Sequence, residues 1–468
     1  MRFKWMILIL LVTAFSSQAR IVNARSGSRT DVQTALNDAR IGDTVKIPAG
    51  NFVFNNGVSV PGGITIMGAG RDKTTLRRTH SSSSWMFNVN CSNGERFVLT
   101  GLTIEGISPT MSRGIKLTNH CKDFRIYDNS FIRLNDRAIE IHGNTRGVID
   151  HNTFIDNEPT AVVIFGDGDA AWERPLTLGS KEAVYVEDNY FEQIHVDDPT
   201  RVHHIASNNG SRYVFRYNRV KDGHINGNVV DAHGNKFYWP RGSRSYEVYE
   251  NHFQIGHRWA GMNFRGGDGV VFNNVMEGSL VSPIHLLYEG RDGSCSNYPC
   301  VDQIRQLHIW NNTYNGDEAE VYNRHPQTVK LNRDYFLSAC EEYVPYRYPH
   351  PLTLSSPITP AVTPQNRASA AVKTLALQGG MDKSRQGVKI SYSLPSELLK
   401  RTNLVRFAIY TTRGRLVRSL QKEHRTGGTY ELMWDGSGQD SRPVANGLYK
   451  VIMSVGGRKI SNKLMFMK

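Results

Sequence analysis

The sequence is poor in cysteine and, beyond residue 15, lacks any apolar run long enough to cross a membrane. Of its 468 residues, 5 are cysteine and 18 are proline. Gly and Pro are spread unevenly, which excludes a collagen-like repeat. Because no apolar run of spanning length follows residue 15, no transmembrane anchor is expected. Hydrophobic residues make up 39% and charged residues 21%, a composition typical of a globular rather than a disordered chain.

Acidic residues are also in the minority, but only in one part of the chain. The whole sequence carries 56 Lys and Arg against 43 Asp and Glu. Residues 371–468 alone hold 18 Lys and Arg against 6 Asp and Glu, whereas residues 20–370 are almost neutral. A nucleic-acid binder would need a basic surface on its main body. We therefore expect no nucleic-acid partner.

The N-terminus has the composition of a secretory signal peptide. Arg2 and Lys4 precede an apolar stretch at residues 6–15, and Ser17 and Ala19 form a small-x-small cleavage site. We expect residues 1–19 to be a signal peptide and the protein to be secreted or exposed at the cell surface.

The cysteines fit an exported protein. Cys295 and Cys300 lie close together in a segment rich in Gly, Ser, Asn and Pro, which predicts a loop disulfide. Cys91, Cys121 and Cys340 leave at least one odd thiol. A zinc site is the rival interpretation, but no second close pair of Cys or His has suitable spacing.

A short motif recurs seven times and predicts a solenoid. Each copy is a β-rich segment followed by Asn, one further residue and an apolar residue. The asparagines are Asn129, Asn152, Asn189, Asn218, Asn251, Asn274 and Asn312. The shortest spacing, 23 residues, fits one turn of a right-handed parallel β-helix, and longer spacings add a loop. Coils about 4.8 Å apart would stack these asparagines into a ladder, with the residues three and five positions earlier facing the core.

The first coil carries a family resemblance. Residues 31–40 predict an amphipathic helix capped by Thr30 or Asp31, which would cover the open end of the core. Residues 42–50 (GDTVKIPAG) follow, and together the two segments resemble the opening of pectate-lyase-like parallel β-helix proteins. The resemblance covers roughly residues 30–345. It implies an all-β fold with a right-handed parallel β-helix domain at residues 20–350.

The composition changes after residue 350. Residues 351–374 are rich in Pro, Ser, Thr and Ala and predict a linker. Alternating strands are predicted at 388–394, 404–410, 428–434 and 447–453, so residues 375–468 should form a small immunoglobulin-like β-sandwich. This segment resembles immunoglobulin-like modules of the flagellar hook-capping type and of type IX secretion. Its basic character implies the cell envelope or secretion machinery as a partner.

Outward-facing residues two positions before the ladder asparagines predict a binding groove. They include Arg216, Tyr249 and Trp310, which suit an extended sugar chain, and the acidic Asp150 and Glu187. A salt bridge between Glu187 and Arg216 on a solvated face is the alternative. Residues 148–154 (VIDHNTF) resemble a pectate lyase strand whose region supplies calcium ligands, which makes Asp150 and Glu187 the candidate Ca²⁺ ligands. The positive charge of Arg216 argues against a cation.

The densest polar stretch, residues 190–265, supplies the candidate catalytic residues. Residues 239–251 (WPRGSRSYEVYEN) resemble a pectate lyase segment in which an arginine takes the proton, which implies Arg241 or Arg244. Chemically, arginine is a better carboxylate clamp than a base. A lysine is the more credible base, and histidines titrate near neutrality. The catalytic candidates are Lys221, His224, His233, Arg241, Arg244 and, as the acid, Tyr185; Trp239 and Arg265 join the substrate-binding candidates.

These patterns favour an exported polysaccharide lyase that cleaves an acidic, uronate-containing polysaccharide by β-elimination. A glycoside hydrolase on the same fold is the first alternative, and it would need close carboxylates from Asp150, Glu187, Asp222 and Asp231. A non-catalytic glycan-binding surface protein is the second.

Overall fold

The chain divides into two units, residues 1–362 and 363–468. The computed structural model describes residues 19–79, 81–92, 94–107, 111–195, 202–236, 239–290, 295, 297–354, 376–382, 387–394, 403–411, 416–424, 428–438, 442–455 and 458–466. All but the last residue of the predicted signal peptide, and most of the predicted linker, lie outside these residues. In the part that the structure describes, no helix is both long and apolar enough to cross a membrane.

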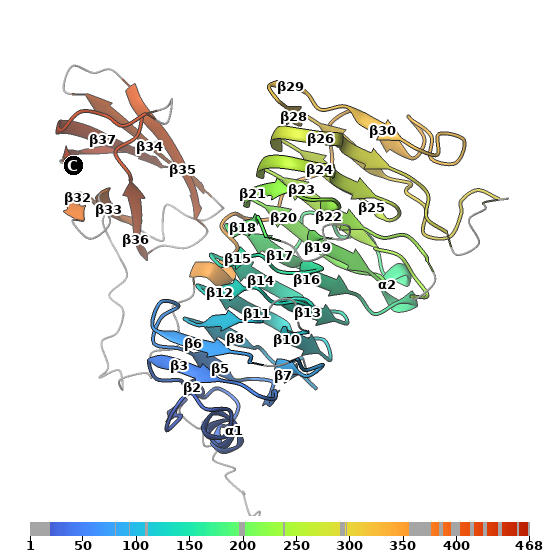
Figure 1. Ribbon diagram of the computed structural model, residues 1–468. Helices are drawn as coiled ribbons and strands as arrows, with labels where there is room; N and C mark the ends of the chain where they lie inside the picture. Colours follow the sequence, from blue (N-terminus) through green and yellow to red (C-terminus); the bar gives the residue numbers. More distant parts are fainter. Residues whose placement is uncertain are drawn as a thin grey trace, which may run out of the picture. The chain divides into compact units, whose positions relative to one another are not determined.

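The first unit is a parallel β-helix, as predicted (Figure 1). One wall is a parallel 12-stranded sheet, here called sheet A. Its strands are β1 (Ile21–Asn23), β2 (Thr44–Lys46), β5 (Thr65–Met67), β8 (Val98–Thr100), β11 (Lys122–Tyr127), β14 (Arg146–Asp150), β17 (Val184–Glu187), β20 (Arg212–Arg216), β23 (Ser245–Tyr249), β25 (Asp268–Phe272), β27 (Leu307–Trp310) and β31 (Tyr335–Phe336).

The other two walls belong to a 19-stranded sheet, whose strands form two rows. The first row follows sheet A in each coil and comprises β3 (Gly50–Val53), β6 (Thr74–Arg77), β9 (Thr103–Glu105), β12 (Ser130–Ile132), β15 (Thr153–Ile155), β18 (Tyr190–Gln193), β21 (Arg219–His224) and β28 (Thr313–Tyr314). The second row comprises β4 (Val58–Pro61), β7 (Trp85–Asn90), β10 (Arg113–Thr118), β13 (Ile139–His142), β16 (Thr160–Phe165), β19 (His203–Asn208), β22 (Asn228–Ala232) and β30 (Val321–Asn323). Two long strands, β24 (His252–Phe264) and β26 (Val275–Leu286), pass through both rows, and β29 (Asp317–Glu318) pairs antiparallel with β28.

The predicted asparagine ladder is present from Asn129 to Asn312. Each side-chain amide donates to the Oδ1 of the asparagine in the next coil, over 2.8–3.1 Å. The same Oδ1 also accepts the backbone N–H of the preceding asparagine. The residues three positions earlier, such as Ile126 and Val186, are fully buried in the core. The ladder thus fixes where each coil turns from sheet A into the first row.

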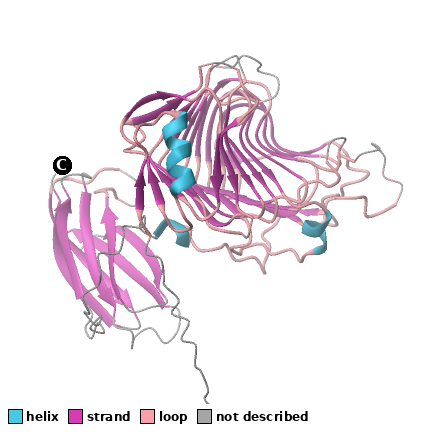
Figure 2. Cartoon of the chain, turned by 90° about the horizontal axis from the view of Figure 1, so that it is seen from below, coloured by secondary structure: helices cyan, strands magenta, loops and turns pink. Residues whose placement is uncertain are grey.

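The N-terminal helix covers the end of the solenoid, but it begins earlier than predicted. α1 spans Arg29–Asp38, and Ser28 is its N-cap, since the Ser28 hydroxyl accepts a hydrogen bond from the Asp31 amide. Val32, Ala35 and Leu36 face the core. Figure 2 shows α1 lying across the end of the strand stack. The cap was misassigned because Ser28, Thr30 and Asp31 are all good capping residues.

A segment without regular strands covers the outer face of sheet A. Residues 340–354, here called the cover segment, end in the 3₁₀ helix η1 (Pro351–Leu354). Tyr343, Tyr346 and Leu352 of this segment pack against outward-facing residues of β14, β17, β20, β23 and β25. Part of the predicted linker therefore belongs to the packed solenoid.

Two disulfides are formed. Cys295 pairs with Cys300, as predicted, and Cys91 pairs with Cys121 across one coil. Cys340 is the odd thiol.

The second unit is an antiparallel β-sandwich, which confirms the predicted fold class. One sheet contains β32 (Ala376–Asp382), β33 (Gly387–Leu394) and β36 (Gly428–Trp434). The other contains β34 (Asn403–Thr411), β35 (Leu416–His424), β37 (Gly447–Val455) and β38 (Arg458–Phe466). Trp434 lies in the core between Tyr449 and Phe466.

Candidate functional site

Charged side chains gather on the outer face of the second row, around the buried carboxylate of Asp231. His233, Arg265 and Glu289 complete what we call the charged cluster. Arg265 bridges the two carboxylates: Nε lies 3.1 Å from Asp231 Oδ1 and Nη1 lies 2.8 Å from Glu289 Oε1. His233 does the same, with Nε2 3.2 Å from Asp231 Oδ2 and Nδ1 3.3 Å from Glu289 Oε2.

Strand alternation places this cluster. Val230 and Ala232 face the core, so Asp231 between them faces outward. Asn263 is in register with Asp231 on the next coil, and its side-chain amide donates to Asp231 (3.1 Å). His285 is in register with Asn263 on the coil after that. A Cβ on Gly234 would lie 2.3 Å from the carbonyl oxygen of Glu289, so only glycine allows this close turn beneath the cluster.

The cluster holds its members in fixed charge states. Burial opposes ionisation of Asp231, yet Arg265 and His233 hold the pKa of Asp231 well below its usual range. The pKa of Glu289 falls to about 2: burial opposes ionisation, but the hydrogen bond from His233 and the charge of Arg265 outweigh it. Burial would lower the pKa of His233, but Asp231 raises it above the ordinary histidine value. The pairing with Asp231 thus favours the cationic form of His233.

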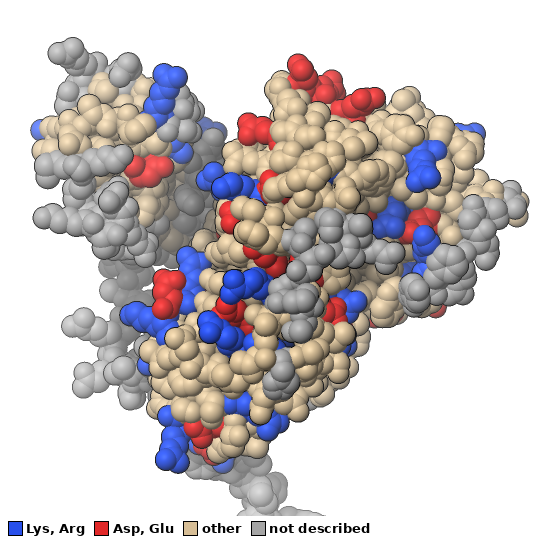
Figure 3. All heavy atoms as spheres, viewed as in Figure 1, with Lys and Arg blue, Asp and Glu red and all other residues tan. Residues whose placement is uncertain are grey.

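The cationic members are the ones that solvent reaches. The side chain of His233 is 30% exposed, whereas that of Asp231 is fully buried. Lys236 is 51% exposed, and its Nζ lies 3.6 Å from Glu289 Oε1. Burial lowers the pKa of the neighbouring His203 to about 4, so this histidine is neutral. A ligand approaching the cluster thus meets positive charge and hydrogen-bond donors first. Acidic and basic side chains are otherwise interspersed over the solenoid (Figure 3).

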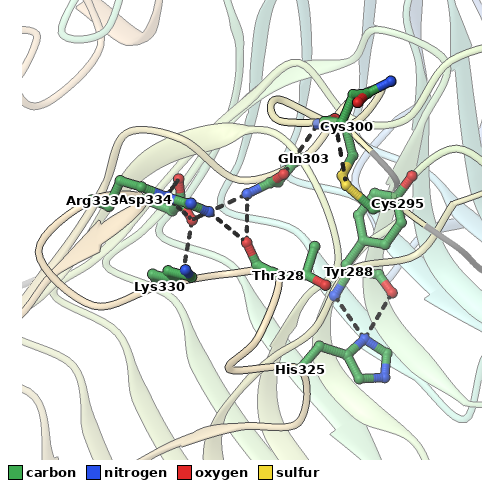
Figure 4. Close-up of a disulfide and its surroundings, with 10 residues drawn as sticks. Tyr288, Cys295, Cys300, Gln303, His325, Thr328, Lys330, Arg333 and Asp334 are labelled. Atoms are coloured by element: carbon green, nitrogen blue, oxygen red, sulfur yellow. Dashed lines mark hydrogen bonds and ion pairs between the residues drawn. A yellow bond between two sulfur atoms is a disulfide. The ribbon is translucent and has the colours of Figure 1, made fainter.

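Two predicted arginines flank the cluster but are held by carboxylates. Arg241 binds both oxygens of Asp302, with Nε–Oδ1 at 2.9 Å, and Arg244 binds Asp268 at 2.9 Å. Next to the Cys295–Cys300 disulfide, the Cys300 amide donates to Gln303, whose side-chain amide donates to Asp334 (Figure 4). Both arginines are thus ion-paired cations rather than proton acceptors.

Trp239 reaches back over earlier coils. Its ring centroid lies 4.4 Å from that of Phe165 on β16 and 6.4 Å from that of His142 on β13. The loop after β22 therefore places an aromatic ring above the second row, on the same face as the charged cluster.

Lys221 and His224 lie in a different part of the coil. Both are on β21, in the first row, where Lys221 is 57% exposed near Glu192 and His224 stacks on His257. Lys221 pairs in register with Gln254, whereas Asp231 pairs with Asn263. These partners are nine residues apart along β24, up to about 30 Å in an extended strand. The structure does not bring Lys221 or His224 to the charged cluster.

The predicted groove on sheet A is not open. Arg216 is fully buried: it binds Glu187 at 2.7 Å, the Tyr249 hydroxyl at 2.9 Å and the Tyr346 carbonyl at 2.7 Å. Tyr185 is also buried, and burial raises its pKa far above the ordinary value, so it is a poor acid. Trp310, at the edge of the covered area, stacks on Phe272. Alternation correctly predicted that this column faces outward, but the cover segment occupies the space.

The two candidate calcium ligands are each paired with arginine. Asp150 accepts two hydrogen bonds from Arg125, at 2.8 and 2.9 Å, and Glu187 binds Arg216. No group of three or more His, Cys, Asp or Glu side chains that could hold a metal ion occurs among the described residues. Guanidinium groups fill the positions that a cation would take, so Asp150 and Glu187 do not fit calcium.

Several residues of the charged cluster and its surroundings were not predicted from the sequence. Lys236, Glu289, Asn263 and His285 were not singled out, and Asp231 was considered only as a hydrolase carboxylate. Asp222, in the same hydrolase set, is buried against His204 and Arg258. The ladder asparagine marks the turn after sheet A, and loops of varying length follow it. Second-row residues therefore have no marker from which their register can be counted.

Comparison with known protein families supports both folds. Residues 42–174 match the family described as right handed beta helix region, and residues 386–458 match the FlgD Ig-like domain. The chain thus carries a right-handed β-helix region followed by an FlgD-type immunoglobulin-like domain. Among curated proteins, none matches this chain.

Solved structures with a similar fold are distant in sequence. An alginate lyase from Paenibacillus sp. str. FPU-7 is 12% identical, covers 65% of this chain and 98% of its own, and has a TM-score of 0.39. The A-module of mannuronan C-5 epimerase AlgE4 from Azotobacter vinelandii is 15% identical, covers 65% of this chain and 91% of its own, and has a TM-score of 0.41. At these identities the likeness concerns the fold alone.

Proposed function

We propose that the outer face of the second row binds an acidic polysaccharide and cleaves it by β-elimination. The observation that supports this most directly is the charged cluster. Its carboxylates are buried, whereas the His233 side chain is partly exposed and the Lys236 side chain is exposed. A uronate carboxylate would be attracted to this surface and would not face an exposed acidic group.

The residues of the cluster can meet the demands of the reaction. β-Elimination needs positive charge near the substrate carboxylate, because negative charge develops there when the neighbouring C–H bond breaks. We assign that charge to His233 and Arg265. We assign proton removal to Lys236 in its neutral amine form, which takes the proton and becomes an ammonium; its side chain is more exposed than those of His233 and Arg265. The electrons of the C–H bond form the new double bond, the glycosidic C–O bond breaks, and the leaving oxygen takes a proton from water.

The pKa values favour a lyase over a hydrolase at this site. A glycoside hydrolase needs a carboxylic acid that stays protonated until it donates to the leaving oxygen. The pKa of Glu289 is about 2 and that of Asp231 is also lowered, so both are ionised at neutral pH. Burial raises the pKa of Glu247 to about 7, but Glu247 bonds to Tyr343 of the cover segment.

A polysaccharide panel tests the reaction. Pectate, alginate and glycosaminoglycans would be incubated with the protein, with and without a chelator, while ultraviolet absorbance of unsaturated uronate and reducing ends are followed. We expect both signals to rise together, with Lys236→Ala and His233→Ala reducing the rate at least 100-fold. The matched controls Lys221→Ala and His224→Ala should retain it. Reducing ends without absorbance would indicate a hydrolase, and loss of activity only in the controls would refute the site.

The basic charge of residues 371–468 supports a second role, attachment to an anionic envelope surface. We propose that the exported protein is held there through its C-terminal module. High salt should release such a protein from cells, whereas retention at high salt would contradict the electrostatic attachment.

A further inference from the structure

We propose that a second acid–histidine pair, Glu140 and His142, binds a second acidic sugar of the same polysaccharide, three coils before the charged cluster. This inference rests on the proposed function and adds to it a minimum substrate length.

The two pairs occupy equivalent positions in their coils. Glu140 on β13 is in register with Val163, which is in register with Ala206, which is in register with Asp231. His142 and His233 each follow their acid by two residues, so alternation places them on the same outer face. The acid-x-His unit thus recurs after three coil steps, about 14 Å at about 4.8 Å per step.

The chemistry of the second pair also matches that of the first. Glu140 is almost buried and binds His142 Nε2 at 2.7 Å, Arg137 Nη1 at 2.6 Å and Lys116 Nζ at 3.2 Å. Burial opposes its ionisation, but the His142 bond and the Arg137 charge lower the pKa of Glu140 to about 2. The three partners are each a quarter to a third exposed. One buried carboxylate therefore holds several exposed donors toward solvent, as Asp231 does.

The floor between the pairs is mainly apolar, with Asn208 next to Phe165 as a polar member. Val163, Ala206 and Phe165 lie on the two intervening coils, and all three are buried. The Trp239 ring packs at a tilt against Phe165 and lies 6.4 Å, between ring centroids, from His142. The strand residues of this floor are too buried to contact a sugar, so the partly exposed ring of Trp239 is the aromatic surface offered to sugar rings, whereas the charged ends suit carboxylates. Because one coil step is close to the length of one sugar residue, the two ends would hold the first and fourth sugars of a four-residue stretch.

The proposed subsite can be tested by binding, independently of turnover. The full chain carrying Lys236→Ala, in which we expect cleavage to be at least 100-fold slower, would be titrated calorimetrically with oligosaccharides of two and six residues prepared from pectate, alginate and glycosaminoglycans. The test variant adds Lys116→Ala and His142→Gln and leaves Glu140 paired with Arg137. The matched control adds His252→Gln, which removes a similar exposed acid–histidine contact, to Glu277 at 3.1 Å, elsewhere on the solenoid.

We expect the six-residue chain to bind at least tenfold more tightly than the two-residue chain. The test variant should bind the six-residue chain about tenfold more weakly, the size expected for a lost charge-assisted hydrogen bond. The control should bind it with unchanged affinity. Thermal unfolding confirms that each variant is folded, and His142→Gln alone serves if the double change is not. Equal loss of affinity in the control, or tight six-residue binding unaffected by the test variant, would overturn the subsite and leave the proposed function intact. Failure of every oligosaccharide to bind would overturn both.

Discussion

Replacing Arg216 with methionine should destabilise the solenoid without affecting substrate binding. Arg216 is the central contact beneath the cover segment, since it binds the carbonyl oxygens of Tyr346 and Arg347 at 2.7 and 2.8 Å as well as Glu187. The methionine side chain has a similar length but offers neither charge nor donors. Among the described residues, the buried carboxylate of Glu187 would then keep a hydrogen bond only from the His350 amide, at 2.7 Å.

The expected loss follows from that uncompensated charge. Removing one partner of a buried ion pair costs about 3–5 kcal/mol of unfolding free energy. Burial already raises the pKa of Glu187 despite the pairing with Arg216, which shows how poorly this site tolerates the free carboxylate. The double variant Glu187→Gln/Arg216→Met removes the charge problem and should return to within about 2 kcal/mol of the wild type. The half-exposed Arg77, paired with Glu105 at 2.7 Å, is the control, and Arg77→Met should cost less than about 1 kcal/mol.

Urea unfolding of the full chain measures these differences, and limited proteolysis reports whether residues 340–354 are released. Arg216→Met should accelerate cleavage in the cover segment, and the double variant should restore protection. Polysaccharide binding per folded molecule should be unchanged. A variant that keeps wild-type stability but loses polysaccharide binding would refute the reasoning, because it would mean that sheet A presents an open binding face.

Two further predictions concern the ladder and the cluster. The two side-chain N–H groups of Asn218 are shared among three acceptors, and its Oδ1 accepts two hydrogen bonds in the buried ladder. Asn218→Ala should therefore cost about 3 kcal/mol, whereas Asn144→Ala at an exposed turn should cost less than about 0.5 kcal/mol. Equal effects in urea unfolding would contradict the ladder's role. The pKa of His233 is raised in the folded chain, so its stabilising contribution is complete below the ordinary histidine pKa and is lost as pH rises through the raised value. The stability difference between wild type and His233→Gln should therefore shrink at alkaline pH, and a difference that grows there would contradict the charged state of His233.

Much of the architecture could be predicted from sequence because it depends on short-range repetition. The ladder asparagines recur with the same neighbours in every coil, and each is satisfied by an identical residue in the next coil. The alternation before each asparagine also predicted correctly which residues face the core and which face outward. The strands of the C-terminal sandwich at 388–394, 404–410, 428–434 and 447–453 agree with β33, β34, β36 and β37.

The candidate site depended on contacts that no local pattern encodes. Alternation places Arg216 and Tyr249 on an outer face, but it contains no information about residues 340–354, which return from more than a hundred residues later to cover them. Similarly, Glu289 reaches His233 from 56 positions away, across two coils whose loops differ in length. His233 and Arg265 were among the predicted residues, and so was Lys221, whereas Lys236 in the same polar stretch was not.

The sequence alone thus determined the repeat, the direction of each side chain relative to its sheet and the presence of a second, basic β-sandwich module, because these follow from backbone periodicity and composition. Only the tertiary structure decided that residues 340–354 cover the outer face of sheet A, and which charges neutralise one another. Those outcomes depend on loop lengths and on segments distant in the chain, whose meeting places are set by the stacking of coils rather than by their own residues.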